Sequence, residues 1–264
     1  MVKISLIQSQ PILGEPDKNI QNLIPLLAQT EGSALIVLPE LANSGYNFTS
    51  RAQAMELSET IDESKFIEFL HQHASAANCH IVSGMNERER DLLYNTAVLI
   101  GPGGLIGRYR KLHLFMNEKD IFEPGNRGLP VFDIGEMTVG IQICFDYLFP
   151  ETWRILALKG ADMICHPSNL VTPYGQKVVP IHSIVNGVYA ITANRTGADG
   201  DLKFSGGSII TGTRGEVLAR ASENKPEVIT IEIDPEKSRN KMITEKNHAL
   251  HDRRPDQYGE ILDK

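Results

Sequence analysis

Short runs of β-branched and other apolar residues recur along the 264-residue chain, and most alternate with segments of helical periodicity. Several runs are apolar on both faces, which is typical of strands that helices cover on at least one side. The expected strands are Val2–Ile7, Ala34–Leu38, Ile81–Met85, Thr96–Ile100, Val139–Cys144, Met163–Cys165, Val188–Thr192, Ser208–Thr211 and Val228–Ile233. The expected helices are Lys18–Gln29, Glu63–Ala77, Glu151–Lys159 and Tyr174–Asn186.

Two Gly-rich turns, at residues 101–104 and 212–215, each join two short apolar runs and predict β-hairpins. Antiparallel pairs therefore accompany the strand–helix units, and the pattern indicates an α/β (α+β) fold with layered sheets covered by helices. No repeat, low-complexity tract or linker marks a boundary, so residues 1–264 are expected to form a single domain. Residues 235–264 form a polar tail, either a solvated extension or a segment that packs on a neighbouring subunit.

The composition excludes several classes of partner. The formal net charge is −7, and no stretch concentrates Lys and Arg between aromatic residues, which argues against nucleic-acid binding. The sequence contains no run of 18 apolar residues, the length that a membrane span needs, and its first residues lack the features of a secretory signal. We therefore expect a cytoplasmic protein that is not anchored to a membrane.

Two of the expected strands lead into a reactive charged side chain, at the place where layered α/β proteins gather catalytic groups. Glu40 follows Ala34–Leu38, and a carboxylate there is suited to proton transfer. Lys111 follows Leu105–Tyr109, the run after the Gly-rich turn at residues 101–104, and an ammonium group in a dry pocket can stabilise an oxyanion. When each residue is considered alone, alternatives remain: Glu40 could cap the next turn, and Lys111 could lie at a solvated basic strand end.

The three cysteines are odd in number and lack CxxC spacing, which argues against a disulfide framework and a zinc ribbon. Cys79 and Cys165 are expected to be small buried hydrophobic residues, as most free cysteines are. Cys144 instead ends an apolar strand, and a helix is expected to begin near Pro150. A thiol on such a turn lies near free backbone N–H groups that favour a thiolate, so Cys144 is the predicted nucleophile.

Five motifs together resemble the carbon–nitrogen hydrolase family, also called the nitrilase superfamily, and they follow the family's order. They are LPELANSGY around Glu40, YRKLHLF around Lys111, EKDIFEPG from Glu118, GIQICFDYLFPE around Cys144 and RRPDQY from Arg253. The resemblance covers nearly the whole chain. It implies a four-layer α-β-β-α sandwich whose subunits pair, as a homodimer or larger oligomer, through helices near the nucleophile and through the C-terminal tail.

The resemblance also implies a Glu–Lys–Cys triad. Cys144 would attack a nitrile or amide carbon, and Glu40 would act as the general base. Lys111 would stabilise the tetrahedral intermediates, with the backbone N–H of Phe145 as a second donor. Glu118 matches a further carboxylate that positions the substrate or adjusts the protonation of the triad.

Substrate selection is expected to involve the loops beyond these strands. Tyr46, Phe145, Tyr147 and the segment 166–174, which includes Asn169, are the predicted pocket wall. Aromatic side chains near the thiol suggest a small or slender substrate. The sequence Phe-Asp after Cys144 is closer to the amidase and N-carbamoyl amide hydrolase branches than to the Trp-Glu of the nitrilase branch.

These observations predict a cysteine-dependent hydrolase that cleaves a small carboxamide or N-carbamoyl amide through a thioester and releases ammonia. The alternatives within the family are a nitrilase acting on a small aliphatic nitrile and an amidotransferase-like acyl transfer. A Cys165–His166 enzyme is disfavoured because adjacent strand residues point to opposite faces. A non-catalytic binding protein is disfavoured by the filled triad, and the chain shows no metal or cofactor motif.

Overall fold

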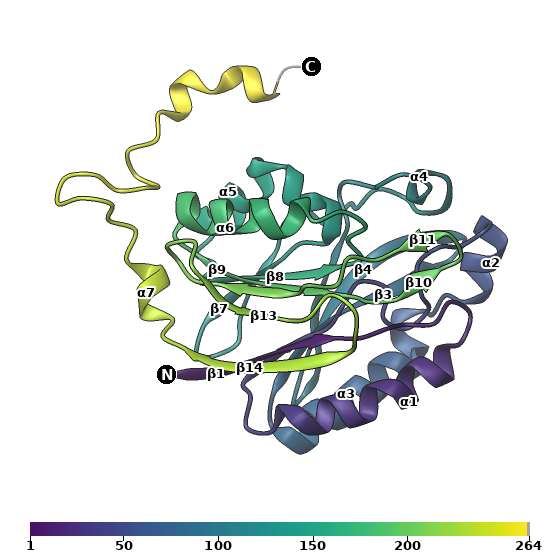
Figure 1. Ribbon diagram of the computed structural model, residues 1–264. Coiled ribbons are helices and arrows are strands. Elements are labelled where there is room, and N and C mark those ends of the chain that lie inside the picture. The colour runs from purple at the N-terminus through teal and green to yellow at the C-terminus, as the bar shows by residue number, and fades with distance from the viewer. Residues whose placement is uncertain (263–264) are drawn as a thin grey trace.

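Two six-stranded sheets lie face to face in the computed structural model, which describes residues 1–262. Helices cover the outer face of each sheet, so that the layers follow the order α-β-β-α (Figure 1). The predicted four-layer sandwich is therefore confirmed. Residues 263–264, the last two of the expected tail, lie outside the described residues.

The first sheet has the order β14-β1-β2-β3-β4-β5. Its strands are β14 (Glu227–Ile233), β1 (Val2–Gln8), β2 (Leu35–Val37), β3 (His80–Glu89), β4 (Leu92–Gly101) and β5 (Gly104–Arg110). Strands β1, β2 and β3 are parallel, whereas β14, β4 and β5 join antiparallel. The parallel strands bring their carboxyl ends to one edge, where the loop after β2 begins.

The second sheet has the order β13-β12-β9-β8-β7-β6. Its strands are β13 (Val217–Arg220), β12 (Ile209–Thr211), β9 (Tyr189–Asn194), β8 (Met163–Ser168), β7 (Thr138–Ile141) and β6 (Val131–Asp133). Strands β7, β8 and β9 are parallel. A separate small hairpin consists of β10 (Ala198–Asp199) and β11 (Leu202–Lys203).

Two longer helices cover each sheet (Figure 1). Helices α1 (Pro16–Leu27) and α3 (Lys65–Ala77) pack on the first sheet, and α5 (Pro150–Leu158) and α6 (Tyr174–Asn186) pack on the second. The shorter α-helices are α2 (Arg51–Glu56), α4 (Glu118–Ile121) and α7 (Glu236–Arg239). The 3₁₀ helices are η1 (Ala28–Thr30), η2 (Ile61–Glu63), η3 (Cys144–Leu148), η4 (Pro255–Gln257) and η5 (Gly259–Leu262). Among residues 1–262, no helix has the length and apolar character that a membrane span requires.

Helix α3 shows how local signals set the ends of an element. The Ser64 side chain accepts a hydrogen bond from the backbone N–H of Ile67 and caps the N-terminus, and Asn78 ends the helix in a left-handed conformation. Phe66, Leu70 and Ala74 are spaced four residues apart and are buried against the first sheet. The helix is therefore held by its caps and by one apolar face.

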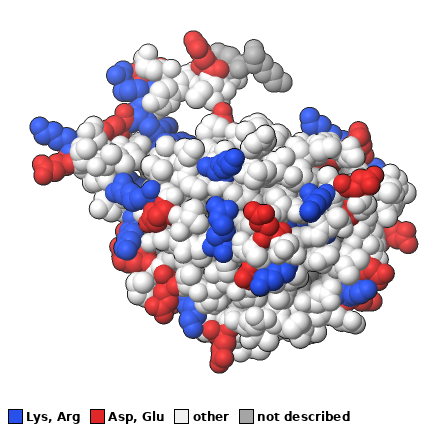
Figure 2. Space-filling view, in the orientation of Figure 1, with Lys and Arg blue, Asp and Glu red and all other residues white. Residues whose placement is uncertain are grey.

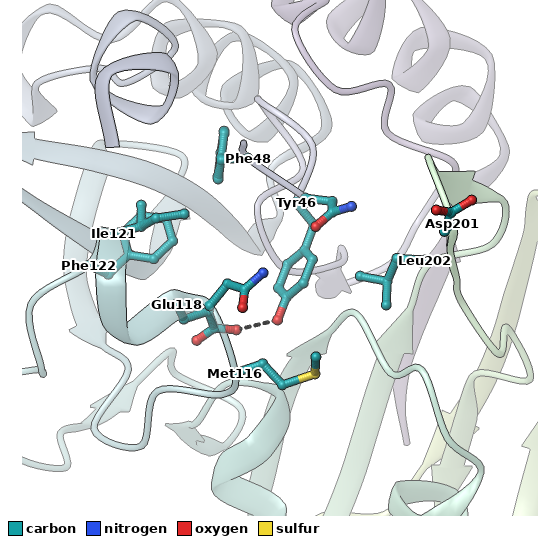
Figure 3. A pocket seen from close by; sticks show the side chains of 10 residues that line it. Tyr46, Phe48, Met116, Glu118, Ile121, Phe122, Asp201 and Leu202 are labelled. Carbon is teal, nitrogen blue, oxygen red and sulfur yellow. Dashed lines mark hydrogen bonds between the residues drawn. The ribbon is translucent and has the colours of Figure 1, made fainter. Parts of the chain in front are cut away.

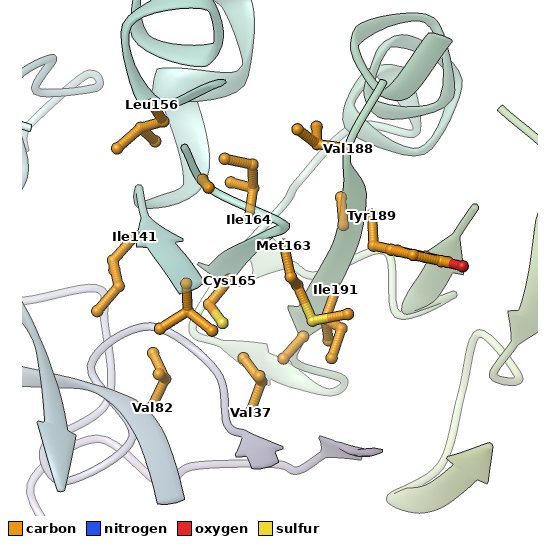
Figure 4. Packing of buried hydrophobic residues seen from close by; sticks show 14 of the residues in the cluster. Val37, Val82, Ile141, Leu156, Met163, Ile164, Cys165, Val188, Tyr189 and Ile191 are labelled. Carbon is orange, nitrogen blue, oxygen red and sulfur yellow. The ribbon is translucent and has the colours of Figure 1, made fainter. Parts of the chain in front are cut away.

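The main hydrophobic core lies between the sheets (Figure 4). Met163 and Cys165 on β8 belong to this layer with Val37 and Val82 of the other sheet. The alternate residue Ile164 points toward the helix side, as the strand period of two requires. Cys165 is fully buried here, and Cys79 is fully buried in the core under α3, which confirms that both cysteines are core residues.

Several element boundaries differ from the expectation, and the difference at Cys144 concerns the predicted nucleophile. The predicted strand Val139–Cys144 ends at Ile141, and Cys144 is the first residue of η3 rather than the last residue of a strand. The tail forms α7 and then extends away from the sheets (Figure 1). It still contacts the body after α7, since Lys241 donates a hydrogen bond to the carbonyl oxygen of Gly187 at 2.8 Å and Arg154 of α5 donates one to that of Ala249 at 3.2 Å.

Candidate active site

Lys111 lies between two carboxylates in the interior of the sandwich. Its Nζ donates to Oε1 of Glu40 and to Oε1 of Glu118, each at 2.7 Å. Glu40 follows β2, Lys111 follows β5 and Glu118 begins α4, and all three are buried. The fold therefore brings together the three charged residues that the sequence singled out.

The ionisation of this cluster follows from burial and charge pairing. Burial alone would lower the pKa of Lys111, but the carboxylates of Glu118 and Glu40 outweigh that effect and raise it. Burial raises the pKa of Glu118 against the opposing charge of Lys111, and the neighbouring Glu40 raises it further. One ammonium group thus pairs with two carboxylates, and Glu118 binds a proton more readily than usual.

Tyr46 completes the surroundings of Glu118. Its phenol donates a hydrogen bond to Oε1 of Glu118 at 2.7 Å (Figure 3), and the backbone N–H of Phe115 donates to Oε2 at 3.2 Å. Burial and the charges of Glu118 and Glu40 raise the pKa of Tyr46 well above its usual value. The phenol therefore stays protonated and remains a donor to Glu118.

Cys144 opens a turn that is unusual for a residue with a side chain. Its φ angle is +43°, in the left-handed region that favours glycine. Its carbonyl oxygen accepts a hydrogen bond from Nε2 of His166 at 2.8 Å, and burial lowers the pKa of His166 to about 4. His166 is thus a neutral donor that holds the turn, and its Nε2 contacts Cys144 rather than Cys165. Its Nδ1 lies 3.0 Å from Oγ1 of Thr192.

The thiol of Cys144 is protonated in the resting site. Burial raises its pKa well above the usual value, and the charge of Glu40 adds to this effect. Lys111 and a backbone hydrogen bond with Asn169 oppose it. A nucleophilic attack by Cys144 therefore needs a base, and the buried Oε2 of Glu40 has no hydrogen-bond partner within residues 1–262.

Sequence reasoning missed Asp146, which ties the turn at Cys144 to the strand end at Lys111. Its fully buried carboxylate accepts from the Tyr109 phenol at 2.7 Å and from the backbone N–H of Ile143 at 2.9 Å. It also accepts from the backbone N–H of His113 at 3.2 Å. The signal in the sequence is an acidic residue within the apolar run after Cys144.

Two hollows adjoin these groups. One has a volume of about 240 Å³ and is bordered by Tyr46, Met116, Glu118 and Leu202 (Figure 3). The other is narrow, about 30 Å³, and is lined by Cys144 together with its predicted neighbours Phe145, Tyr147 and Asn169, and by Phe115, Leu170, Val171 and Thr172. The side chain of Asn169 is also held in place, because its amide donates a hydrogen bond to the backbone oxygen of Glu40 at 3.1 Å.

Among residues 1–262, no group of three or more His, Cys, Asp or Glu side chains is arranged so that it could hold a metal ion. The chemistry that these residues can perform is nucleophilic attack by a thiol beside a carboxylate base and an ammonium group. Such an arrangement suits acyl transfer at an amide or nitrile carbon.

Comparisons with known proteins agree with this geometry. A family profile described as carbon–nitrogen hydrolase matches residues 3–241. The chain is 47% identical to a nitrilase of Pyrococcus abyssi, with 98% of this chain and 99% of that protein aligned. It is 32% identical to an (R)-stereoselective amidase of Pseudomonas sp., with 88% and 86% aligned.

A solved structure shows the same fold. The carbon–nitrogen hydrolase of Helicobacter pylori G27 superposes with a TM-score of 0.89 at 27% identity, covering 100% of this chain and 99% of that one. The family profile extends from β1 to the residues just after α7, and thus includes every residue of the charged cluster and Cys144. The chain belongs to the carbon–nitrogen hydrolase family and is a hydrolase of the nitrilase superfamily.

Proposed function

We propose that the protein hydrolyses a small carboxamide or N-carbamoyl amide through a thioester on Cys144, with release of ammonia. The observation that carries this proposal is the buried Glu40–Lys111–Glu118 cluster beside a protonated, buried thiol. Relatives with amidase names, including the (R)-stereoselective amidase, support the choice of an amide.

In the proposed reaction, Sγ of Cys144 bonds to the carbonyl carbon while Glu40 takes the thiol proton. The oxygen that gains negative charge is stabilised by the Lys111 ammonium, with the backbone N–H of Phe145 as a second donor. The C–N bond then breaks, and Glu40 returns the proton to the leaving ammonia. Water attacks the thioester, with Glu40 again as the base, and releases the acid and the thiol.

Glu118 and Tyr46 are proposed to orient the substrate from the opposite side of Lys111. Both border the hollow of about 240 Å³, whose other walls are largely apolar. Phe145, Tyr147 and Asn169 are proposed to line the part of the site next to the thiol. The small size of both hollows favours a short or slender substrate.

A nitrilase reaction is the second candidate, and one observation favours it. The relative that is 47% identical over nearly the whole chain is a protein named nitrilase. The same thiol, base and ammonium group could form a thioimidate on a nitrile carbon. The two candidates differ in the substrate that first occupies the site.

The deciding experiment measures ammonia release from aliphatic nitriles, primary amides, ω-amides of dicarboxylic acids and N-carbamoyl amines. We expect release from amides or N-carbamoyl compounds, complete loss in Cys144→Ala, and retention in the matched control Cys165→Ala, whose thiol is buried between the sheets. Intact mass with a slow substrate should show an acyl adduct on Cys144. Release by Cys144→Ala equal to that of the wild type would refute the mechanism, and release from nitriles alone would select the second candidate.

We further propose that residues 1–264 act as one domain that forms a homodimer, with the tail from residue 235 at the interface. The outer surface of α5 and α6 supports this, because it leaves large apolar side chains exposed: Ile155, Leu158, Ile181, Ile184 and Val185. The tail extends from the body near this surface, where Arg154 contacts it (Figure 1). A second copy of the chain would cover the apolar surface and the tail together.

A further inference from the structure

We propose that Asn95 is the positioning residue of this site: its amide holds Oε1 of Glu40 and so leaves Oε2 as the oxygen that takes the proton of Cys144. The inference rests on the proposed function, since it assigns the base a specific oxygen atom. Asn95 contacts neither of the two hollows and would act only through Glu40 and Lys111.

Asn95 contacts two members of the proposed triad. Its Nδ2 donates to Oε1 of Glu40 at 2.7 Å, and its backbone oxygen accepts from the backbone N–H of Lys111 at 2.9 Å. The residue lies on β4 and is 1% exposed, so water does not compete for these bonds. A single asparagine thus sets the position of the carboxylate and of the strand end that carries the ammonium group.

The two oxygens of Glu40 are made different by these contacts. Oε1 accepts from both Asn95 and Lys111, at 2.7 Å each, whereas Oε2 is buried without a hydrogen-bond partner in the described chain. A carboxylate with one oxygen fully engaged can rotate only by breaking two short bonds. Oε2 is therefore held as the free acceptor in a site where Cys144 keeps its proton.

The charged and titratable groups around Glu40 come from five places in the fold. Lys111 follows β5, Glu118 begins α4, Tyr46 lies in the loop after β2, Cys144 begins η3 and Arg195 follows β9. Asn95 adds a neutral donor to these groups, so it orients Glu40 without adding charge. A carboxylate or an ammonium group at position 95 would change the net charge of the buried cluster.

The test compares Asn95→Leu with Asn86→Leu. Asn86 faces Asn95 across the β3–β4 ladder, is equally buried, and its amide donates to the backbone oxygen of Ala54 instead of to the triad. We expect Asn95→Leu to lower kcat about 100-fold with KM nearly unchanged, because a misplaced catalytic group costs rate rather than substrate binding. Asn86→Leu should keep kcat within a few-fold of the wild type.

A second readout does not need a substrate. The rate at which iodoacetamide alkylates Cys144, followed by peptide mass spectrometry, reports whether Glu40 accepts the thiol proton. We expect Asn95→Leu and Glu40→Gln each to slow alkylation, because the loss of the base outweighs the lower thiol pKa that follows when the charge of Glu40 is removed. The double variant should be no slower than Glu40→Gln alone, since both changes act on one step. Asn95→Ser, whose side chain is too short to reach Oε1, carries the same test if Asn95→Leu does not fold.

The outcomes separate this inference from the proposed function. If the wild type hydrolyses its substrate and Asn95→Leu retains full kcat, or loses no more than Asn86→Leu, the positioning role is wrong. Additive slowing of alkylation in the double variant would also overturn it. If the wild type releases no ammonia from any compound of the panel, the proposed function fails, and the alkylation rates still decide whether Asn95 orients Glu40.

Discussion

At the scale of single residues, the site is governed by one ammonium group that neutralises two buried carboxylates. Lys111 is fully buried, and its bonds to Glu40 and Glu118 are both 2.7 Å long. Two carboxylates this close to each other are stable in a dry interior only when a cation separates them. The same residue therefore serves both the stability of the fold and the proposed chemistry.

We predict that Lys111→Met destabilises the protein by about 3–5 kcal/mol, because removal of one partner leaves a buried charge without compensation. Urea unfolding, followed by circular dichroism, measures this change. The double variant Lys111→Met/Glu118→Gln should recover part of the loss, since only one carboxylate then remains. A single variant as stable as the wild type would show that the cluster does not depend on Lys111.

His166 gives the protein a defined sensitivity to acid. Burial lowers its pKa from 6.5 to about 4. Between these two pH values His166 is protonated in the unfolded chain but neutral in the folded chain. The free energy of unfolding therefore falls as the pH drops below 6.5, and the loss due to His166 reaches about 3 kcal/mol near pH 4. We predict that His166→Gln, which can still donate to the Cys144 carbonyl, loses less stability over this range.

The measurement is the free energy of unfolding at several pH values between 7 and 4. His251→Gln is the control, because this histidine lies exposed in the tail. The control should follow the wild-type curve, whereas His166→Gln should be flatter. Parallel curves for all three proteins would mean that His166 does not titrate as its burial requires.

At the scale of elements, strand β3 approaches the loop after β2 so closely that side-chain size is restricted. Gly84 on β3 is bonded to the loop after β2 on both sides: its N–H donates to Pro39 and its carbonyl accepts from Ala42. A Cβ atom at this glycine would lie 2.4 Å from Cα of Glu40. The strand therefore fixes the position of the proposed base through direct backbone contact.

We predict that Gly84→Ala lowers kcat more than tenfold and destabilises the fold by about 1–3 kcal/mol, since the backbone at Glu40 would have to move. Gly103→Ala is the matched control, because a Cβ there meets no atom within 4 Å. Ammonia release and thermal unfolding of both variants test the prediction. Equal activities of the two variants would contradict it.

At the scale of the whole molecule, the exposed apolar surface of α5 and α6 is the strongest indication of assembly. We predict that Ile181→Glu converts the proposed dimer into a monomer, because a charge cannot be buried there without a partner. Ile24→Glu on α1 is the control, since Ile24 is 54% exposed and Ile181 is 56% exposed. Light scattering after gel filtration measures the mass of each variant. A monomeric wild type, or dimers of both variants, would refute the interface.

Much of this architecture could be predicted from patterns within the chain. Apolar runs and helical periodicity located most of the strands and the four longer helices, because burial of one face is a local property of the sequence. The resemblance to the family supplied their arrangement as a four-layer sandwich. The sequence also singled out Glu40, Lys111 and Cys144 by their place after strands and by the family motifs. It wrongly placed Cys144 at the end of a strand instead of at the start of η3, since the left-handed turn depends on a contact with His166, which is distant in the sequence.

The sequence by itself determined the layered α/β fold, the family and the identity of the charged residues, because spacing and residue type encode these features directly. Only the tertiary structure decided that Lys111 bridges both carboxylates, that Asp146 joins the turn at Cys144 to the strand end, and that Asn95 occupies one oxygen of Glu40. These contacts join separate strands and loops, and their lengths and directions depend on how the two sheets pack. Burial then sets the protonation of each group, since the cost of a charge depends on the water that the fold excludes.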